Sequence, residues 1–398
     1  MMLEKARQRW LNISMDVGIY VHIPYCVKKC RYCDFASSAI AGREGTVGPY
    51  IERLKDGIRR TAEHFDGRLS VSSVFFGGGT PSLIDAGLLC SVLDEIRKCF
   101  TVTPDAEISL EANPGTLTEG KLAAYRKAGF NRLSLGIQSL DDRVLAAMGR
   151  IHDSREAAAS FRLASRFFDN INADLMLGVP IQTERIWIDT LERAIDLGPS
   201  HLSFYSLQLE EGTPFYDDYR AGRLELSSWE EDRAMYHKGL EIIRDVGFVH
   251  YEISNGALPG RECRHNLRYW TMEPYLGFGS AAHSFIGGVR YENGALPFSV
   301  GGDPDETIAR SRSFTWAEGE RLADLKGDFL FTQLRLIEGM DTGLYQRLFG
   351  TSIESDVGGA LAELAEEGLI EMSKDRIRLT EKGLDMTNPI EEKLLEAL

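Results

Sequence analysis

The chain has 398 residues, of which 43% are hydrophobic, and a formal net charge of −15. Such a length and apolar content can fill one large core and a smaller second one. The negative charge excludes nonspecific binding to nucleic acid or anionic lipid, since both need concentrated Lys and Arg. No apolar stretch approaches bilayer-spanning length and the first residues lack an apolar leader core, so we expect a cytoplasmic protein that is not an integral membrane protein.

Between about residue 17 and about residue 288, short β-rich runs alternate with longer helical patterns. The expected strands are residues 18–23, 72–78, 107–113, 132–139, 171–179, 201–209 and 249–254. Helical patterns over 118–129, 154–168 and 183–198 open with Ser, Thr or acidic residues. This alternation is typical of repeated βα units and predicts an α/β fold built as a partial (β/α) barrel.

Directly after the first expected strand, the run YVHIPYCVKKCRYCDF holds three cysteines, Cys26, Cys30 and Cys33. This C-x3-C-x2-C spacing can hold one iron–sulfur cluster. A [4Fe–4S] cluster normally takes four thiolates, so three would leave one iron with an open coordination position. The alternative is structural zinc, which needs four closed ligands, and His22 is an awkward fourth.

The second expected strand runs into a glycine turn from Gly77 to Gly79, followed by Thr80. Glycines let backbone groups approach a ligand closely, although any tight strand-to-helix turn would use them. Farther on, Cys90 and Cys99 fall in the helical pattern 82–100, where we expect buried inert thiols. Disulfides are not expected, because half of the six cysteines cluster at ligand spacing.

Polar residues follow the ends of successive expected strands, where a barrel collects its chemistry. These residues are Glu111, Asn113, Gln138, Asp174, Gln208 and Glu210. Each one alone could cap the following helix. Several such residues together, at equivalent ends of successive strands, instead favour a ligand site. Arg150 could add a cation for a carboxylate there, unless it is only surface charge.

The tail differs in character from the barrel region. From about residue 308 it reads as helices, and a helix, a glycine turn and the runs LIEMS and RIRLT are typical of a small winged-helix unit. Its acidic composition favours an intramolecular or protein-facing role over DNA binding. We therefore expect an N-terminal extension over residues 1–16, a barrel core over 17–300 and a mainly helical winged-helix-like C-terminal domain over 301–398.

The cysteine spacing with Tyr32 before the last cysteine, together with the GGGTP turn, resembles the radical S-adenosylmethionine superfamily. The segments YVHIPYC, FFGGGTPS, SLEANPG, LSLGIQS, MGRIHD and DLMLGVPIQT resemble its branch of oxygen-independent coproporphyrinogen III oxidase and the radical SAM haem chaperones. The resemblance covers nearly the entire chain. It implies a radical SAM core that carries a [4Fe–4S] cluster on Cys26, Cys30 and Cys33.

The resemblance also implies that S-adenosylmethionine binds the open iron and is cleaved by one-electron reduction, chemistry that belongs to the cofactor. An electron donor for the cluster is then a partner. By motif position, the implied cofactor-binding residues are Tyr20, Tyr32, Gly78, Gly79, Thr80, Glu111, Gln138, Arg150 and Asp174.

The segment from His265 to Trp270 is similar to the haem-associated H-N-x-x-Y-W motif of the chaperone branch. An imidazole can ligate haem iron, and Tyr269 and Trp270 offer flat apolar area. The resemblance thus implies haem as a cofactor, with His265, Asn266, Tyr269 and Trp270 as the haem-binding residues. The alternative is an ordinary loop histidine beside core aromatics. A second, weaker candidate is His283.

Two departures from the oxidases separate the members of that branch, and one is that the oxidases carry a longer amino-terminal segment, for which this chain has little room ahead of Cys26. The oxidases resemble C-x3-C-x2-C-x-C, whereas Phe35 stands two positions after Cys33 in this chain. We therefore expect a haem chaperone that passes haem to acceptor proteins, with respiratory proteins as candidates. The alternatives are a radical SAM enzyme that decarboxylates coproporphyrinogen III or degrades haem, and a zinc-binding module without redox chemistry.

Overall fold

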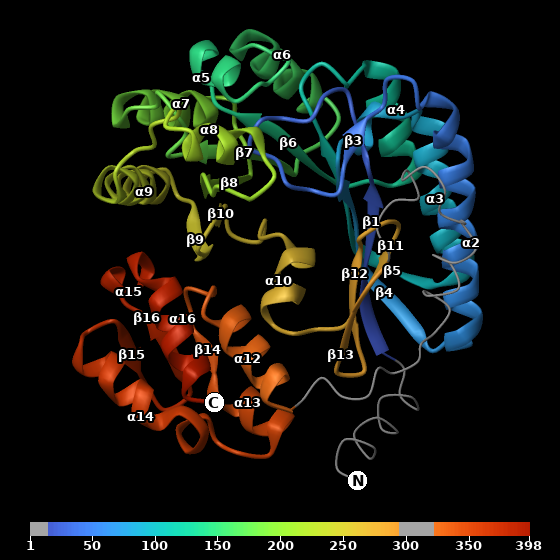
Figure 1. The fold of residues 1–398 in the computed structure, drawn as a ribbon. Helices are drawn as coiled ribbons and strands as arrows, with labels where there is room; N and C mark the ends of the chain where they lie inside the picture. Colours follow the sequence, from blue (N-terminus) through green and yellow to red (C-terminus); the bar gives the residue numbers. More distant parts are fainter. Residues whose placement is uncertain (1–14, 294–321) are drawn as a thin grey trace.

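The computed structural model describes residues 15–293 and 322–398. A curved eleven-stranded sheet forms the large domain, in the order β13-β12-β11-β1-β4-β5-β6-β7-β8-β10-β9. All neighbours from β11 to β8 pair in parallel, and the strands at both edges pair antiparallel. Helices line the outer side of the sheet, and α10 lies on its inner side (Figure 1). This arrangement is the predicted partial barrel.

The large sheet consists of β1 (Met15–Ile23), β4 (Leu69–Gly78), β5 (Thr101–Ala112), β6 (Arg132–Gln138), β7 (Ile171–Leu177), β8 (His201–Ser206), β9 (Val249–Glu252), β10 (Asn255–Ala257), β11 (Tyr275–Phe278), β12 (His283–Ile286) and β13 (Val289–Glu292). Two small sheets contain β2 (Tyr25–Cys26) with β3 (Ser38–Ala39), and β14 (Met340–Asp341) with β15 (Ile370–Met372) and β16 (Arg376–Leu379). Each strand expected from the sequence is present, although the bounds shift by a few residues. The first begins at Met15, inside the expected extension.

The helices of the large domain are η1 (Glu44–Thr46), α2 (Val47–Phe65), η2 (Pro81–Leu83), α3 (Ala86–Cys99), α4 (Glu119–Ala128), α5 (Asp142–Ala147), α6 (Ser154–Ala164), α7 (Glu184–Asp196), α8 (Pro214–Arg220), α9 (Trp229–Asp245) and α10 (Arg264–Trp270). The C-terminal helices are α12 (Leu322–Gln333), α13 (Thr342–Phe349), α14 (Ile353–Glu366), α15 (Glu381–Asp385) and α16 (Thr387–Glu396). Side-chain caps fix the N-termini of many helices. The Thr118 hydroxyl accepts a hydrogen bond from the Lys121 amide at the start of α4, and the Thr183 hydroxyl accepts one from the Ile186 amide at the start of α7.

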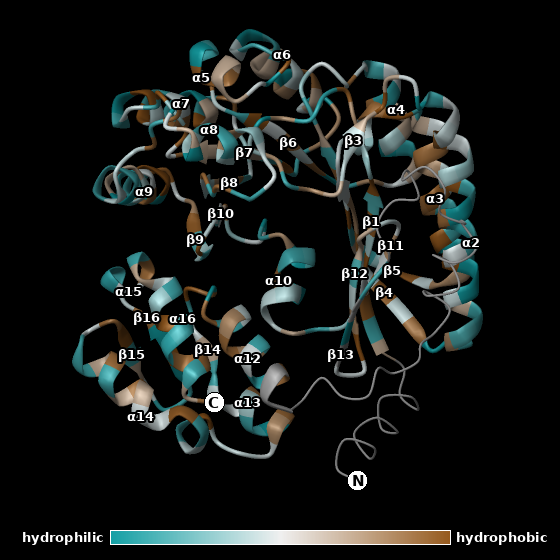
Figure 2. Cartoon of the chain, in the orientation of Figure 1, coloured by the Kyte–Doolittle hydropathy of each residue, from teal (hydrophilic) through white to brown (hydrophobic). Residues whose placement is uncertain are grey.

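The main core lies between the outer face of the sheet and its helices. Alternate residues of β1, such as Val17, Ile19 and Val21, are fully buried there. Helix α2 buries one apolar face against the sheet, and its remaining positions are hydrophilic (Figure 2). The inner face of the sheet is therefore left to carry the polar residues.

A second core belongs to the C-terminal domain. Helix α14 is followed by the antiparallel pair β15 and β16, which is the predicted winged-helix order. The domain packs against the barrel edge, because Arg335 pairs with the buried Glu252 at 3.1 Å and stacks over Trp270 at 4.5 Å. On α9, His237 contacts Asp385 at 2.8 Å. The expected boundary at residues 300 and 301 lies outside the described residues.

The two cysteines of α3 are less buried than the sequence predicts. The sequence predicted that Cys90 and Cys99 are buried, but both are only half-buried. Cys263, in contrast, is fully buried. Cys90 and Cys99 lie on the edge of the face that α3 turns to the sheet.

Across residues 15–293 and 322–398, no helix is both long enough and apolar enough to cross a membrane.

Candidate functional site

The three cysteines lie on a loop that leaves β1 at the carboxyl end of the barrel. Cys26, Cys30 and Cys33 are all half-exposed. The loop is closed at its base by the pairing of β2 with β3, where the Ile40 amide donates to the Cys26 carbonyl at 2.8 Å. The thiols are therefore presented at the barrel mouth on a loop with a fixed base.

His22 connects this loop to the strand below it. Its Nε2 donates to the Ala36 carbonyl at 2.9 Å, and its Nδ1 accepts from the Tyr20 hydroxyl at 3.1 Å. Burial lowers the pKa of the imidazole, so the neutral ring fits both bonds. With both nitrogens engaged inside the protein, His22 is a poor fourth ligand for zinc.

The glycine turn after β4 brings its backbone close to the cysteine loop. The Gly79 amide donates to the Ile23 carbonyl and the Thr80 amide to the Tyr25 carbonyl, both at 2.8 Å. Gly78 has φ +111, and a Cβ there would lie 2.5 Å from the His22 ring. Only glycine fits that position, because a side chain would displace the histidine.

Arg150 gathers several of the predicted residues around the thiols. Its Nη2 donates to Asn113 Oδ1 at 2.6 Å and to the Gly136 carbonyl at 2.8 Å. Its Nη1 lies 3.5 Å from both Cys30 Sγ and the Tyr32 hydroxyl. Asn113 in turn donates to Thr80 Oγ1 at 2.8 Å. Residues from the ends of several strands thus meet at one point.

This network offers donors to an anionic group and to thiolates. The Thr80 hydroxyl donates toward Cys26 Sγ at 3.7 Å, as Arg150 does toward Cys30. The Arg150 Nε atom is buried and has no hydrogen-bond partner among the described residues. Because a buried guanidinium nitrogen needs an acceptor, the site fits a ligand that carries a carboxylate.

A pair of acidic side chains lies deeper in the barrel. Glu111 Oε2 accepts from the Gly78 amide at 3.1 Å. Burial, together with the nearby Asp174 charge, raises the pKa of Glu111 to about 8. Burial also raises the pKa of Asp174, although the Ser134 hydroxyl donates to it at 3.0 Å. Two carboxyls held close in a shielded site can accept a cationic ligand.

Tyr32 presents an aromatic ring beside the cysteines. It packs on a small apolar cluster formed by Val144, Met148, Met176 and Val179. Gln138, whose φ is +64, ends β6 beside Gly136. The structure therefore brings the predicted residues into two adjoining groups, one around Arg150 and one around Glu111 with Tyr20 and Asp174.

The donor set fits a cluster better than a single ion. Within the part of the chain that the structure describes, no three His, Cys, Asp or Glu side chains are grouped to hold one metal ion. Each thiolate of a cluster binds a different iron, so cluster ligands lie farther apart than the ligands of one zinc. The thiol trio is half-exposed, and Thr80 and Arg150 donate toward two of its sulfurs, as cluster thiolates would accept.

The predicted haem segment lies elsewhere, on α10 at the inner face of the sheet. His265 is fully buried, with Nδ1 2.9 Å from Ser73 Oγ and Nε2 2.9 Å from the Tyr269 hydroxyl. Burial lowers its pKa to about 3. Asn266, Tyr269 and Trp270 are half-buried. In this conformation neither ring nitrogen of His265 is open to an iron.

Other predicted residues lie outside these groups. Gln208 and His283 are exposed, and Glu210 is half-buried on the loop after β8. Sequence reasoning missed a buried polar network across the barrel interior, in which Asn172 donates to Ser134 at 2.7 Å and accepts from His201 at 2.7 Å. Alternate polar residues within β7 and β8 were the available signal.

Comparisons with known proteins agree with this geometry. A sequence model of the Radical SAM superfamily matches residues 20–194, and one of the HemN C-terminal domain matches residues 324–386. The solved structure of coproporphyrinogen III oxidase (HemN) from Escherichia coli, a radical SAM enzyme, has a TM-score of 0.79 at 22% identity, over 100% of this chain and 93% of that one. The fold and the cysteine loop thus define a radical SAM protein. Membership of this superfamily implies a [4Fe–4S] cluster and S-adenosylmethionine.

Proteins of similar sequence identify the family within the radical SAM superfamily. The Heme chaperone HemW of Bacillus subtilis (strain 168) is 33% identical over 93% of this chain and 97% of its own length. That of Escherichia coli (strain K12) is 32% identical over 95% and 98%. That of Mycobacterium tuberculosis (strain H37Rv) is 34% identical over 95% and 94%. The chain belongs to the HemW family.

Proposed function

We propose that the protein is a cytoplasmic haem chaperone, which binds haem and passes it to haem-accepting proteins, respiratory proteins among them. The observation that carries the proposal is the near full-length similarity to Heme chaperone HemW proteins from distant bacteria. The exposed Phe35, at the position where the oxidases carry a further cysteine, supports it. The cluster and S-adenosylmethionine then regulate or drive the transfer.

In this proposal Cys26, Cys30 and Cys33 hold the cluster. When bound, the cluster and S-adenosylmethionine supply one-electron reductive chemistry. Arg150 and the backbone at Gly78 and Gly79 orient the carboxylate and amino end of the ligand, and Tyr32 packs against its base. The buried Arg150 Nε, which has no partner within the described parts of the chain, supports this assignment.

The raised pKa of Glu111 makes cofactor binding depend on pH. Glu111 is protonated below about pH 8 in the free site, and a cationic ligand requires its carboxylate. We therefore expect the affinity for S-adenosylmethionine to fall by about tenfold per pH unit as the pH drops below 7. Anaerobic calorimetry on the cluster-loaded protein measures this dependence. Glu111→Gln should bind weakly at every pH, and an equally steep dependence in that variant would contradict the role of Glu111.

Haem ligation by His265 needs a conformational change, because Ser73 and Tyr269 occupy both ring nitrogens. Helix α10 lies between the barrel and the C-terminal domain, so its release would open that junction (Figure 1). We expect His265→Ala to lose the axially ligated Soret spectrum on haem titration. Unchanged affinity and spectrum would remove His265 from the proposal.

A matched variant changes haem binding in the opposite direction. Tyr269→Phe keeps the flat ring but removes one of the two bonds that hold His265 inside. A buried hydrogen bond contributes about 1 kcal/mol, so the apparent haem affinity should rise by about fivefold. The same Soret titration measures it, and a weaker affinity in Tyr269→Phe would show that α10 does not open to bind haem.

A second candidate function is radical chemistry on a porphyrin. A protein that only carries haem does not need charged groups buried in its barrel. The acidic pair Glu111 and Asp174, with the cation of Arg150, therefore favours catalysis as the alternative. Anaerobic incubation of the reconstituted protein with S-adenosylmethionine, a reductant and coproporphyrinogen III separates the two. Vinyl products would favour the enzyme, and their absence would favour the chaperone.

A further inference from the structure

Three large apolar side chains are exposed around the cysteine loop. Val27 and Phe35 on the loop are 44% and 61% exposed, and Ile151, directly after Arg150, is 56% exposed. Single exposed apolar residues are common on protein surfaces, but a group at one site marks an interaction surface. Val27 and Ile151 line one hollow, and Phe35 lies on the same loop as Val27 and the three thiols.

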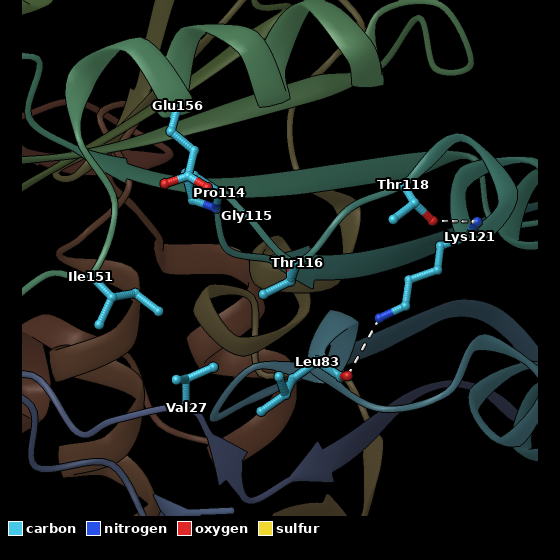
Figure 3. Close-up of a pocket in the computed structure, with 9 residues that line it drawn as sticks. All are labelled: Val27, Leu83, Pro114, Gly115, Thr116, Thr118, Lys121, Ile151 and Glu156. Carbon is cyan, nitrogen blue, oxygen red and sulfur yellow. Dashed lines mark hydrogen bonds between the residues drawn. The ribbon is translucent and has the colours of Figure 1, made fainter.

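A hollow of about 380 Å³ lies beside this group. Val27, Leu83, Pro114, Thr116 and Ile151 line it, together with the charged side chains of Lys121 and Glu156 (Figure 3). Lys121 lies at the wall, where its Nζ donates to the Leu83 carbonyl at 3.4 Å. The hollow can therefore receive a protruding apolar side chain from a partner.

The loop also differs in charge from the rest of the chain. Residues 26–35 contain Lys28, Lys29 and Arg31 against Asp34, whereas the whole chain carries a net charge of −15. Because Arg31 pairs with Asp218, the two lysines are the cations that this loop offers to a partner. Lys28 and Lys29 are exposed, and Lys29 Nζ donates to the Phe35 carbonyl at 2.9 Å. An acidic partner would be repelled by most of the protein and attracted to this loop.

We propose that Val27, Lys28, Phe35 and Ile151 form the docking surface for a small acidic electron-carrier protein, one that holds a flavin or an iron–sulfur centre. The inference rests on the proposed cluster at Cys26, Cys30 and Cys33. In the step that this surface serves, one electron leaves the carrier, which is oxidised, and enters the cluster, which is reduced. Transfer falls steeply with distance, so the carrier must dock over this loop. A small, weak interface is typical of such encounters.

The test measures the rate at which a reduced flavodoxin, an acidic flavoprotein, reduces the cluster of the full-length reconstituted protein. We compare Lys28→Glu and Ile151→Asp with Lys374→Glu, which makes the same charge change on the turn after β15 in the distant C-terminal domain (Figure 1). At low salt, Lys28→Glu and Ile151→Asp should be about tenfold slower than wild type, and Lys374→Glu unchanged. High salt should slow the wild type toward the rate of Lys28→Glu.

Photoreduction by a small deazaflavin and an iron and sulfide assay accompany each variant, since neither depends on docking. Equal deazaflavin rates and equal iron content, with slow flavodoxin reduction, support the surface. Equal flavodoxin rates in all variants would overturn it while leaving the cluster intact. If Lys28→Glu loses iron, the comparison of Ile151→Asp with wild type decides the question, because Ile151 lies outside the cysteine loop. A wild type that never holds iron would instead overturn the proposed function.

Discussion

Replacing Cys26, Cys30 or Cys33 by serine is expected to abolish stable assembly of the iron–sulfur cluster. Only three cysteines lie on this loop, so each substitution leaves two thiolates where a [4Fe–4S] cluster already lacks the usual fourth. Anaerobic reconstitution should give about four irons and four sulfides per wild-type chain and much less in each variant. Absorbance and Mössbauer spectra measure the loss.

Cys90→Ser and Cys99→Ser are the matched controls for this prediction. Both thiols are half-buried on α3, away from the loop, and should leave iron content unchanged. Full iron content in a loop variant, or loss of iron in a control, would contradict the assignment of the ligands.

Replacing Arg335 by methionine is expected to lower the free energy of unfolding by about 3 kcal/mol. The substitution leaves the fully buried Glu252 carboxylate without its cationic partner, and such broken buried pairs are strongly destabilising. It also removes the guanidinium that stacks on Trp270 at the junction of the two domains. Denaturant unfolding followed by tryptophan fluorescence measures the loss.

The control is Arg378→Met, which breaks a pair with Glu371 in which both side chains are more than half exposed. Exposed pairs contribute little, so this variant should lose less than 1 kcal/mol. Burial raises the pKa of Glu252, and the lone carboxylate is costly only when charged. The deficit of Arg335→Met should therefore be full at neutral pH and shrink as the pH falls. A deficit no larger than that of Arg378→Met would contradict the account.

The sequence predicted the strands and the mouth of the barrel because both rest on local patterns. Apolar runs define β1 and β4 to β8, and polar residues at their carboxyl ends follow from the parallel topology. The network of Arg150 with Asn113 and Cys30 could not be predicted as contacts, because it joins three segments far apart in the chain. The sequence offered Arg150 as a cation for a carboxylate, but not its partners.

The environment of α10 was also beyond the sequence. His265, Tyr269 and Trp270 indicate an aromatic segment, but their pattern does not tell whether they face solvent or the barrel interior. Their environment depends on contacts with Ser73 and Arg335, which lie far from α10 in the sequence. The sequence also did not predict that the side chains of Val27 and Phe35 are exposed. Both residues lie within the cysteine motif, which local patterns assign to cofactor binding.

The account is tested most directly by haem transfer. The Soret spectrum is followed after the anaerobically reconstituted, haem-loaded protein is mixed with a haem-free acceptor haem protein. The account predicts that about one haem per chain is bound and then moves to the acceptor. A protein that binds no saturable haem, or that keeps its haem in the presence of the acceptor, would contradict it.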